Sequence, residues 1–468
     1  MFISLSAMVT PTQLKHLYNR AAFGLSPSTK EISKPSVPAL LKSAVTDKPI
    51  QVIEKPDGDY EGIKQNAETA KLLLKKNKEA QIKLNTAWFS QLTHPDAALR
   101  EKMTFFWHDH FACRVRNAYL GQQQINTIRT HALGKFGDLL LAVSKDPGML
   151  QFLNNQQNKK DSPNENFARE VMELFTLGRG NYSEQDIKNA ARAFTGWAFN
   201  PLTGEFIFRQ RQHDFGSKTF RGKTGNFSGE DIINMILEDK QTACFITTKI
   251  INFFVGSEIE KPLLDELTRT FYQSEYDISK LMLTIYSSDW FYDEKYKGNR
   301  IKSPVELIAG MQVHTNGAFN NPLNMIFLQK ALGQVLLQPP NVGGWPNGRE
   351  WIDSSSLTFR MSLPTLMLRN ASSNFEAKDD GDANDATNSA SKPGQMSYSV
   401  DWVALTKIFH PSNSEKTLAK VENFLLVQPT TDENRKIIAA FAESGKTEPE
   451  FLKNSFIGYM SLPEYQLS

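Results

Sequence analysis

The sequence predicts a mainly α-helical protein: a multi-helix globular body with a small β-hairpin or loop insertion and loops rich in proline and glycine. Three observations support this prediction. Helical amphipathic periodicity runs through most of the 468 residues. Capping residues and prolines precede several of the apolar runs. The periodicity breaks down around residues 204–222, where aromatic and β-branched residues alternate with turn residues instead.

Helix signals begin near the amino terminus. Thr10-Pro11 places a capping residue and a first-turn proline ahead of an apolar face that includes Leu14. That helix should end before Gly24. Residues 61–94 form a long, charged amphipathic stretch, which predicts a second, solvent-facing helix.

Two more helices are predicted in the middle of the chain. Ser162-Pro163-Asn164-Glu165 combines an N-cap serine, a first-turn proline and a capping-box glutamate, and the helix should stop at Gly178. Ser183 begins the next helix, which should run to about Trp197. The short glycine-rich turn between them predicts a helical hairpin.

The segment 204–222 predicts the β insertion. Phe206–Phe208 and Lys218–Phe220 could pair as a small hairpin. Helices should resume over residues 229–335. Residues 338–348 hold three prolines and three glycines, so we expect a loop there.

Composition suggests how the chain is divided. Residues 1–370 form the expected helical main body. Residues 371–397 are a low-complexity run of small and polar residues that cannot bury enough apolar area to order themselves, so we expect a flexible excursion. Residues 398–468 regain helical periodicity and should pack back on the main body.

Several classes of protein are disfavoured. The formal net charge is +2, so no strong field attracts nucleic acid or a membrane surface. Two cysteines, Cys113 and Cys244, cannot form a disulfide framework. No stretch approaches the roughly 20 apolar residues of a membrane span. The first residues lack the basic and continuous apolar regions of a signal peptide, so a cytoplasmic protein is the default expectation.

Two histidines on one predicted helix are the first candidates for chemistry. His108 and His110 are two residues apart, so on a helix they point in nearly opposite directions and cannot hold one ion together. His110 continues an apolar stripe and should face inward. The alternative interpretation is a core histidine that hydrogen-bonds a backbone carbonyl.

The second candidate is a pair of carboxylates three residues apart, Glu170 and Glu173, on one helix face. Such a pair suits a divalent cation, or two acids whose pKa values are driven apart for acid–base work. Arg169 lies four residues from both Glu165 and Glu173. A solvated helix face that carries ion pairs is the competing interpretation.

The third candidate is His213-Asp214, with Lys218 close by, in the non-helical segment. A histidine and an acid on a loop above a helical body are well placed for function. Asp214 could instead simply cap the turn at Gly216. A further residue, Trp345 in the proline- and glycine-rich loop, is more typical of a plug that anchors the loop than of a pocket wall.

Several motifs occur together in one order, and with them the chain resembles the bacterial domain-of-unknown-function 1800 (DUF1800) family over nearly its whole length. The segments that carry the resemblance are Asn19-Arg20-Ala21-Ala22-Phe23-Gly24, Phe106-Trp107-His108-Asp109-His110-Phe111, Asn164 through Gly178, Ala193-Phe194-Thr195-Gly196-Trp197, His213 through Lys218, and Pro339 through Trp345. The resemblance implies no particular activity.

The resemblance does imply a context. Family members often look secreted, and their genes often lie beside genes for proteins that resemble phosphatases and sulfatases. It therefore implies a phosphatase/sulfatase-like partner encoded nearby and a periplasmic or secreted location. The absence of a convincing leader departs from that pattern, although a folded protein could leave the cytoplasm bound to a partner that carries the signal.

Two hypotheses follow. The first is a helical metal-dependent hydrolase or oxidoreductase, in which a divalent metal ion is held by some of His108, His110, Glu170, Glu173 and His213. The catalytic groups would be Glu170, Glu173, His213, Asp214 and Arg169, with Arg169 orienting a carboxylate or binding an anionic substrate. The second is a non-catalytic assembly, maturation or export partner of the phosphatase/sulfatase-like protein.

Overall fold

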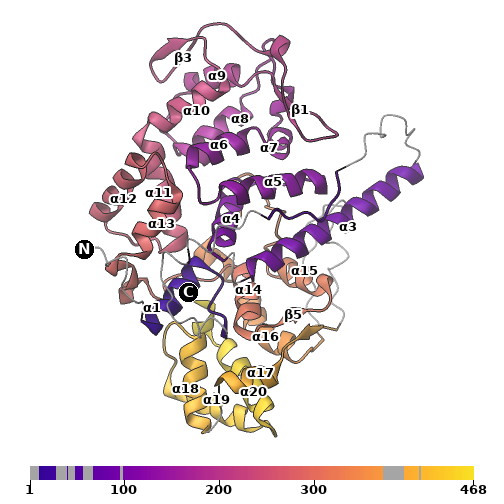
Figure 1. Ribbon diagram of the computed structural model, residues 1–468, viewed down its shortest axis with the longest axis vertical. Helices are drawn as coiled ribbons and strands as arrows, with labels where there is room; N and C mark the ends of the chain where they lie inside the picture. Colours follow the sequence, from indigo (N-terminus) through magenta and orange to yellow (C-terminus); the bar gives the residue numbers. More distant parts are fainter. Residues whose placement is uncertain are drawn as a thin grey trace.

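A computed structural model describes residues 10–27, 40, 48–55, 67–94, 98–372, 395–409 and 413–468. This part of the chain is mainly α-helical, as the sequence predicts, and its strands form two-stranded antiparallel sheets. Figure 1 shows the strands β1 and β3 at one end of the molecule and the helices α18, α19 and α20 at the other, with α4 between them.

The amino-terminal helices begin where their caps predict. Helix α1 (Pro11–Ala21) has Thr10 as its N-cap, and Thr10 forms a capping box with Gln13. Helix α3 (Ala67–Leu92) is the long charged helix expected over residues 61–94. Helix α4 (Ala98–His110) is almost entirely buried and ends at the second of the two candidate histidines.

The next elements form the region around β1 and β3. They are α5 (Ala118–His131), α6 (Phe136–Ser144), α7 (Pro147–Phe152), the 3-10 turn Asn155–Gln157, α8 (Asn166–Glu170), a π-helical segment Val171–Thr176 and α9 (Glu184–Ala193). Ser183 caps α9 through a capping box with Asp186, so that predicted helix start is confirmed.

The predicted helix start at Ser162 is wrong. The amide of Ser162 donates to the Lys159 carbonyl, which makes a tight turn. The Asn164 amide is bound by the side chain of Asn158, 2.9 Å away. These contacts hold the segment out of a helix, which starts only at Asn166, where the Asn164 side chain accepts the Asn166 amide.

The predicted pairing of Phe206–Phe208 with Lys218–Phe220 is also wrong. Strand β2 (Phe206–Phe208) pairs with β1 (Trp197–Phe199), and β3 (Lys218–Phe220) pairs with β4 (Lys223–Gly225). Each strand therefore pairs with its nearest neighbour in the chain, which costs less loop-closure entropy than the predicted pairing. The remaining sheet joins β5 (Ala318–Phe319) to β6 (Tyr398–Ser399).

Helices make up most of the rest of the chain, as expected. They are α10 (Gly229–Glu238), α11 (Lys240–Phe254), α12 (Lys261–Gln273), α13 (Ile278–Tyr286), α14 (Pro304–Thr315), α15 (Pro322–Ala331), α16 (Ser354–Leu368), α17 (Trp402–Phe409), α18 (Ser414–Leu425), α19 (Asp432–Glu443) and α20 (Glu448–Met460). Short 3-10 turns lie at Asp289–Tyr292, Glu294–Tyr296, Gly348–Trp351 and Pro463–Gln466.

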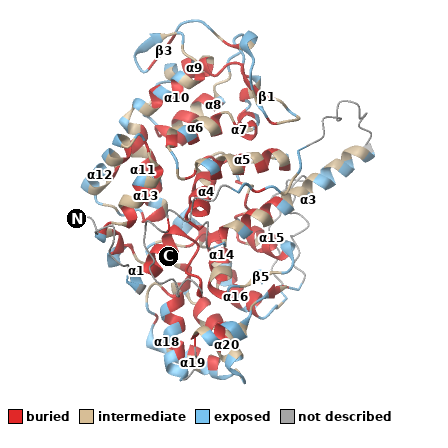
Figure 2. Cartoon of the chain, viewed as in Figure 1, coloured by how far each residue is buried: buried red, intermediate tan, exposed pale blue. Residues whose placement is uncertain are grey.

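The core consists of two hydrophobic clusters that meet at α1 and α4. Phe106 and Trp107 belong to the cluster shared with α5 to α13, whereas Phe105 belongs to the cluster shared with α14 to α20. Helix α1 is divided in the same way, with Leu17 in the first cluster and Leu14 in the second. Figure 2 shows buried residues running continuously through α4 and its neighbours. These two helices therefore tie the halves of the molecule together.

The carboxyl-terminal helices contact the rest of the chain directly. The Lys15 ammonium of α1 donates to the Leu426 carbonyl beyond α18, and Phe319 pairs with Tyr398 across β5 and β6. Most of the predicted flexible excursion, residues 373–394, lies outside the described residues. At its edges the Met396 amide donates to the Ala371 carbonyl at 3.3 Å, so the ends of that segment lie side by side.

Two further findings concern the whole described chain. None of its helices combines the length and the apolar character needed to cross a membrane. Cys113 and Cys244 are both free thiols.

Candidate functional site

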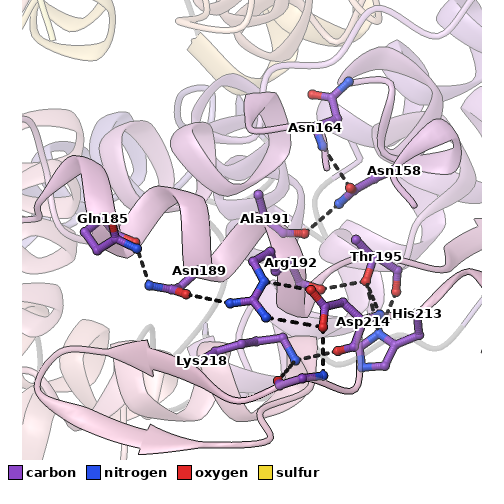
Figure 3. Close-up of polar contacts among 11 residues, drawn as sticks. Asn158, Asn164, Gln185, Asn189, Ala191, Arg192, Thr195, His213, Asp214 and Lys218 are labelled. Atoms are coloured by element: carbon purple, nitrogen blue, oxygen red, sulfur yellow. Dashed lines mark hydrogen bonds and ion pairs between the residues drawn. The ribbon is translucent and has the colours of Figure 1, made fainter. Parts of the chain in front are cut away.

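The loop that carries His213 is held against the end of α9. Nδ1 of His213 lies 2.8 Å from the carbonyl oxygen of Thr195. Because a carbonyl can only accept, Nδ1 carries the proton of this hydrogen bond. The Asp214 amide donates to Oγ1 of Thr195 at 2.8 Å. Figure 3 shows the two residues converging on Thr195.

Gly196 makes this close approach possible. Its φ angle is +81°, and a Cβ at this position would lie 2.8 Å from the Arg209 carbonyl oxygen and 3.3 Å from Cβ of His213. The Arg209 amide donates to the Gly196 carbonyl at 2.7 Å, and the Gly196 amide donates to the Asn158 carbonyl at 3.0 Å. Only glycine allows the loop to lie this close to the end of the helix.

The Asp214 carboxylate is engaged by its neighbours. Nε of Arg192 lies 2.7 Å from Oδ2, and the Gly216 amide donates to Oδ1 at 2.7 Å. Burial alone would raise the pKa of Asp214, but the Arg192 and Gly216 hydrogen bonds hold that pKa below its ordinary value. The Lys218 ammonium donates to the backbone carbonyls of Asp214 and Gly216. Asp214 is thus both a turn cap and the partner of a cation.

Exposed apolar side chains surround His213. Phe208 and Phe215 contact its ring edge-on, with ring centroids 5.1 and 4.7 Å away. Their side chains are 45% and 52% exposed, and neighbouring Ile207 is exposed as well. Large apolar groups that stand together in solvent are uncommon on a monomeric protein and mark interaction sites.

A polar pocket of about 550 Å³ lies beside this loop. It is lined by Gln156, Gln157, Lys159, Ser162, Pro163, Asn164, Arg209 and Gln212. The buried side chain of Asn158 organises its floor, because Nδ2 donates to the Ala191 carbonyl at 2.9 Å while Oδ1 accepts the Asn164 amide. Within the described ranges neither Lys159 nor Arg209 has a carboxylate partner, so the pocket presents unpaired positive charge.

The sequence-based argument missed this pocket. Its signal was the amide-rich run Asn154-Asn155-Gln156-Gln157-Asn158 followed by two lysines, which lies just before the predicted helix start. Side-chain amides both donate and accept hydrogen bonds, so a dense run of them outside a helix favours a polar binding surface.

Glu173 and Arg169 pair with different partners. Tyr182 donates its hydroxyl to Glu173 at 2.6 Å, and Arg179 donates to the same carboxylate at 2.7 Å. The Tyr182 and Arg179 hydrogen bonds lower the pKa of Glu173. Arg169 pairs with Glu184 at 2.9 Å and with Glu165 at 3.2 Å, not with Glu173. This face of the helical hairpin therefore carries ion pairs.

Glu170 stands beside this network. Burial, and then the nearby negative charge of Glu173, raise its pKa. It is half-buried, and no hydrogen bond joins its carboxylate to another described residue. Of the two predicted carboxylates, Glu170 is therefore the one that accepts a proton more readily.

His108 and His110 face different parts of the interior. Nε2 of His108 accepts the Leu337 amide at 3.2 Å, and its ring lies between Trp88 and Trp345. Nε2 of His110 lies 3.1 Å from the Phe175 carbonyl. Burial lowers the pKa of each to about 3, so both rings are neutral at physiological pH. His110 thus matches the core-histidine interpretation.

The Trp345 loop is anchored to the same helix. Its amide donates to Oδ1 of Asp109 at 2.8 Å, and its side chain is buried. This is the plug arrangement rather than an open pocket wall.

Comparison with known families now adds one finding. A family model described as "Protein of unknown function (DUF1800)" matches residues 16–467. The chain belongs to this family. No curated protein and no solved structure matches the chain. The DUF1800 match spans the His213 loop, the polar pocket and both hydrophobic clusters.

The candidate metal ligands stand apart from one another in this DUF1800 protein. No group of three or more His, Cys, Asp or Glu residues there could hold a metal ion. The five expected ligands were His108, His110, Glu170, Glu173 and His213. Three of the candidate ligands already bind other groups through the atoms a metal would use: Nε2 of His108 accepts the Leu337 amide, Nε2 of His110 bonds the Phe175 carbonyl, and the Glu173 carboxylate is held by Tyr182 and Arg179.

Proposed function

We propose that this DUF1800 protein is a non-catalytic binding partner of another protein, and that the partner docks on the surface around His213. We define the His213 surface by Ile207, Phe208, Arg209, Arg211 and Phe215. One observation carries the proposal: Phe208 and Phe215 are both about half exposed and both contact the ring of one buried histidine. Exposed aromatic anchors held on a rigid base are typical of interface hot spots.

The charges on this surface favour a partner with an acidic rim. Arg209 and Arg211 are exposed beside the aromatic residues, and neither has an ion-pair partner among the residues described. The one carboxylate of the loop itself, Asp214, is neutralised by Arg192. A partner that offers an apolar pocket edged with carboxylates would therefore match both the shape and the charge of the His213 surface.

The family resemblance suggests which protein that is. We propose as the partner the phosphatase/sulfatase-like protein that family members often have encoded nearby. Most of the side chains expected to perform chemistry already form hydrogen bonds or ion pairs with neighbouring residues of this chain. This supports an assembly or maturation role over catalysis.

A binding measurement between the two purified proteins tests this proposal. We expect saturable binding by calorimetry, and a weakening of about 100-fold or more in the double variant Phe208→Ser, Phe215→Ser, since each anchor should contribute about 1.4 kcal/mol or more. The matched control is Leu72→Ser, Leu74→Ser, which removes two equally exposed leucines from α3 and should leave affinity unchanged. No binding, or equal binding by both double variants, would contradict the proposal.

A second candidate, a hydrolase or oxidoreductase, is favoured by the orientation of His213. Its Nδ1–H donates to the Thr195 carbonyl, as in many catalytic or metal-binding histidines, and Nε2 has no hydrogen-bond partner among the described residues. A divalent metal ion there would need ligands beyond this one imidazole.

The test is hydrolysis of p-nitrophenyl phosphate and p-nitrophenyl sulfate, with and without added Mn²⁺ or Zn²⁺. Turnover that His213→Gln abolishes, and that Phe208→Ser leaves intact, would favour the enzyme. If neither ester is hydrolysed, with or without either metal ion, the protein is not a hydrolase for these two ester classes.

A further inference from the structure

Five cations are concentrated in the interior where α1, α4, α14 and α16 meet. We call them the cationic cluster: Arg20, Lys102, Arg300, Lys302 and Arg360. All but Arg300 are buried almost completely, and the side chain of Arg300 is only 13% exposed. Charged side chains are almost never buried this way without compensating partners.

Glu306 is the carboxylate side chain that pairs with this cluster. Oε1 of Glu306 lies 2.6 Å from the Lys102 ammonium and 3.6 Å from Nη1 of Arg300. Burial would raise the pKa of Glu306, but Lys102 and Arg300 lower it strongly, so the group is ionised. One carboxylate side chain therefore pairs within a group of five residues that carry positive charge in water.

The remaining contacts of the cations are to neutral acceptors. Lys302 donates to the Tyr465 carbonyl at 2.7 Å, and Arg360 donates to the Gln466 side chain at 3.0 Å. Such contacts orient a cation but do not cancel its charge. Burial lowers the pKa of Lys102 to about 8 and that of Lys302 to about 7, so the lysines can relieve part of the excess by losing a proton. The guanidinium groups cannot.

Several hydrogen-bond donors in this region have no acceptor. Nε and Nη1 of Arg20 and the hydroxyl of Tyr286 are buried without a hydrogen-bond partner, and Nη1 of Arg300 has only the Glu306 carboxylate, 3.6 Å away and beyond hydrogen-bond distance. Nη2 of Arg20 lies 2.5 Å from Oδ1 of Asn299, the residue before Arg300. The Tyr286 ring packs on Phe291, whose carbonyl oxygen lies 3.0 Å from Nε2 of His16, one turn before Arg20 on α1. A buried donor without an acceptor is costly, so an acceptor placed among these donors would be strongly favoured.

We propose that Arg20, Arg300 and Tyr286 bind a small oxyanion of the phosphate or sulfate class in the interior of the protein. Two guanidinium groups and a phenol supply the planar, forked donors that tetrahedral oxyanions accept best. The bound anion would also offset the excess positive charge beside Glu306. The site is separate from the His213 surface. Arg20 belongs to the motif Asn19 through Gly24, which the proposed function leaves unused.

Thermal unfolding of the full chain in a phosphate- and sulfate-free buffer tests the site. We expect phosphate or sulfate to raise the melting temperature by a few degrees in a saturable way at millimolar concentration or below, at constant ionic strength set with chloride. Arg300→Gln should abolish the shift, and Tyr286→Phe should weaken the apparent affinity about tenfold. These two variants are used because Arg20→Gln could fail to fold.

The control variant is Arg435→Gln, which removes an exposed cation paired with Glu422 and should keep the full shift. A shift that grows linearly with salt, or one that is equal in Arg300→Gln and Arg435→Gln, reflects general salt stabilisation and overturns the proposal. So does a saturable shift produced by chloride alone, or the absence of any shift, since buried water would then satisfy the donors.

Ion chromatography of the supernatant after denaturing the purified protein provides a second measurement. About one equivalent of phosphate or sulfate, lost in Arg300→Gln, would support the site and show which oxyanion the protein retains. If protein saturated with either anion and then desalted releases none, and no saturable thermal shift is seen, the proposal fails.

Discussion

Nε2 of His110 lies 3.1 Å from the carbonyl oxygen of Phe175, so the last residue of α4 donates to the end of the π-helical segment Val171–Thr176. Carbonyls in the last turn of a helix lack partners within the helix, and His110 supplies one. The same ring packs among Phe106, Phe111 and Phe175. This contact joins the central helix to the segment that carries Glu170 and Glu173.

Replacing His110 should therefore cost stability. His110→Ala removes the donor for the Phe175 carbonyl and leaves a cavity among aromatic rings, so we expect the free energy of unfolding to fall by about 2–4 kcal/mol. Urea denaturation measures the change. His131→Ala, on the half-exposed end of α5, is the control and should cost less than about 0.5 kcal/mol. Equal effects of the two changes would show that the Phe175 contact adds nothing.

His108 predicts how stability responds to acid. Its pKa in the folded protein is about 3, lowered by burial, whereas in the unfolded chain it is about 6.5. Between these values the unfolded chain binds a proton that the folded chain does not, so the contribution of His108 to stability falls as the pH drops from about 6.5 toward 3. His108→Gln keeps an acceptor for the Leu337 amide, so stability should decline less steeply between pH 6 and pH 4, by roughly 1 kcal/mol per pH unit. Parallel curves from pH-dependent denaturation would contradict this.

Asp146 predicts a response of the opposite sign. Its Oδ1 caps α7 by accepting the amides of Gly148 and Met149, while Oδ2 is buried without a partner. Burial raises its pKa to about 7. Because the folded pKa is raised, its favourable contribution is complete below about pH 3.8 and is lost as the pH rises through 7.

Asp146→Asn should thus be as stable as the wild type or more stable at pH 8, and should lose that advantage at pH 5. Chemical denaturation at the two pH values measures the difference. A variant that is less stable by the same amount at both pH values would show that the Asp146 carboxyl does not take up a proton on folding in this range.

Gly196 and Gly180 offer a matched pair for testing the His213 loop. Both have φ near +80°, but a Cβ at Gly196 would meet the Arg209 carbonyl and His213, whereas a Cβ at Gly180 would meet nothing within 4 Å. Both alanine variants carry the same backbone strain, so Gly196→Ala should cost at least about 1 kcal/mol more than Gly180→Ala. Hydrogen exchange should also show faster opening of residues 209–216 in Gly196→Ala alone. Identical exchange in the two variants would refute the close packing of this loop.

The carboxylate pair gives a prediction about metal content. Because Glu173 is held by Tyr182 and Arg179, we expect the double variant Glu170→Gln, Glu173→Gln to leave the metal content of purified protein unchanged. Its melting temperature should change by no more than about 2 °C, since exposed ion pairs contribute little. Elemental analysis of the wild type and the double variant measures the metal content. Stoichiometric metal in the wild type that disappears in the folded double variant would restore the predicted metal site.

Local signals predicted local structure well. The helix caps at Thr10 and Ser183 were readable because a capping box uses residues only three apart. Ser162 carries the same type of signal, yet no helix begins there. The deciding contact was the Asn158 side chain on the Asn164 amide, and a capping motif contains no information about such a competitor.

The candidate site shows the same limit. Spacing along the helix placed both Glu165 and Glu173 within reach of Arg169, and Arg169 pairs with Glu165 and, across the turn, with Glu184. Pairing within one helix is only one of the choices open to a long side chain. Folding the hairpin brought the Glu184 carboxylate to 2.9 Å from Arg169, and spacing within one helix does not indicate that pair.

By itself, the sequence determined the helical class, the starts of helices α1 and α9 and the presence of reactive side chains, because these depend on periodicity and on contacts a few residues apart. Only the tertiary structure decided which of those side chains have hydrogen-bond or ion-pair partners and which do not. Arg20, Tyr286 and Arg300 come from well-separated stretches of the chain, and their donors share one neighbourhood only after α1 has packed against the later helices. Burial then removes the water that would have satisfied them, and this turns three unremarkable residues into a site with unmet hydrogen-bonding capacity.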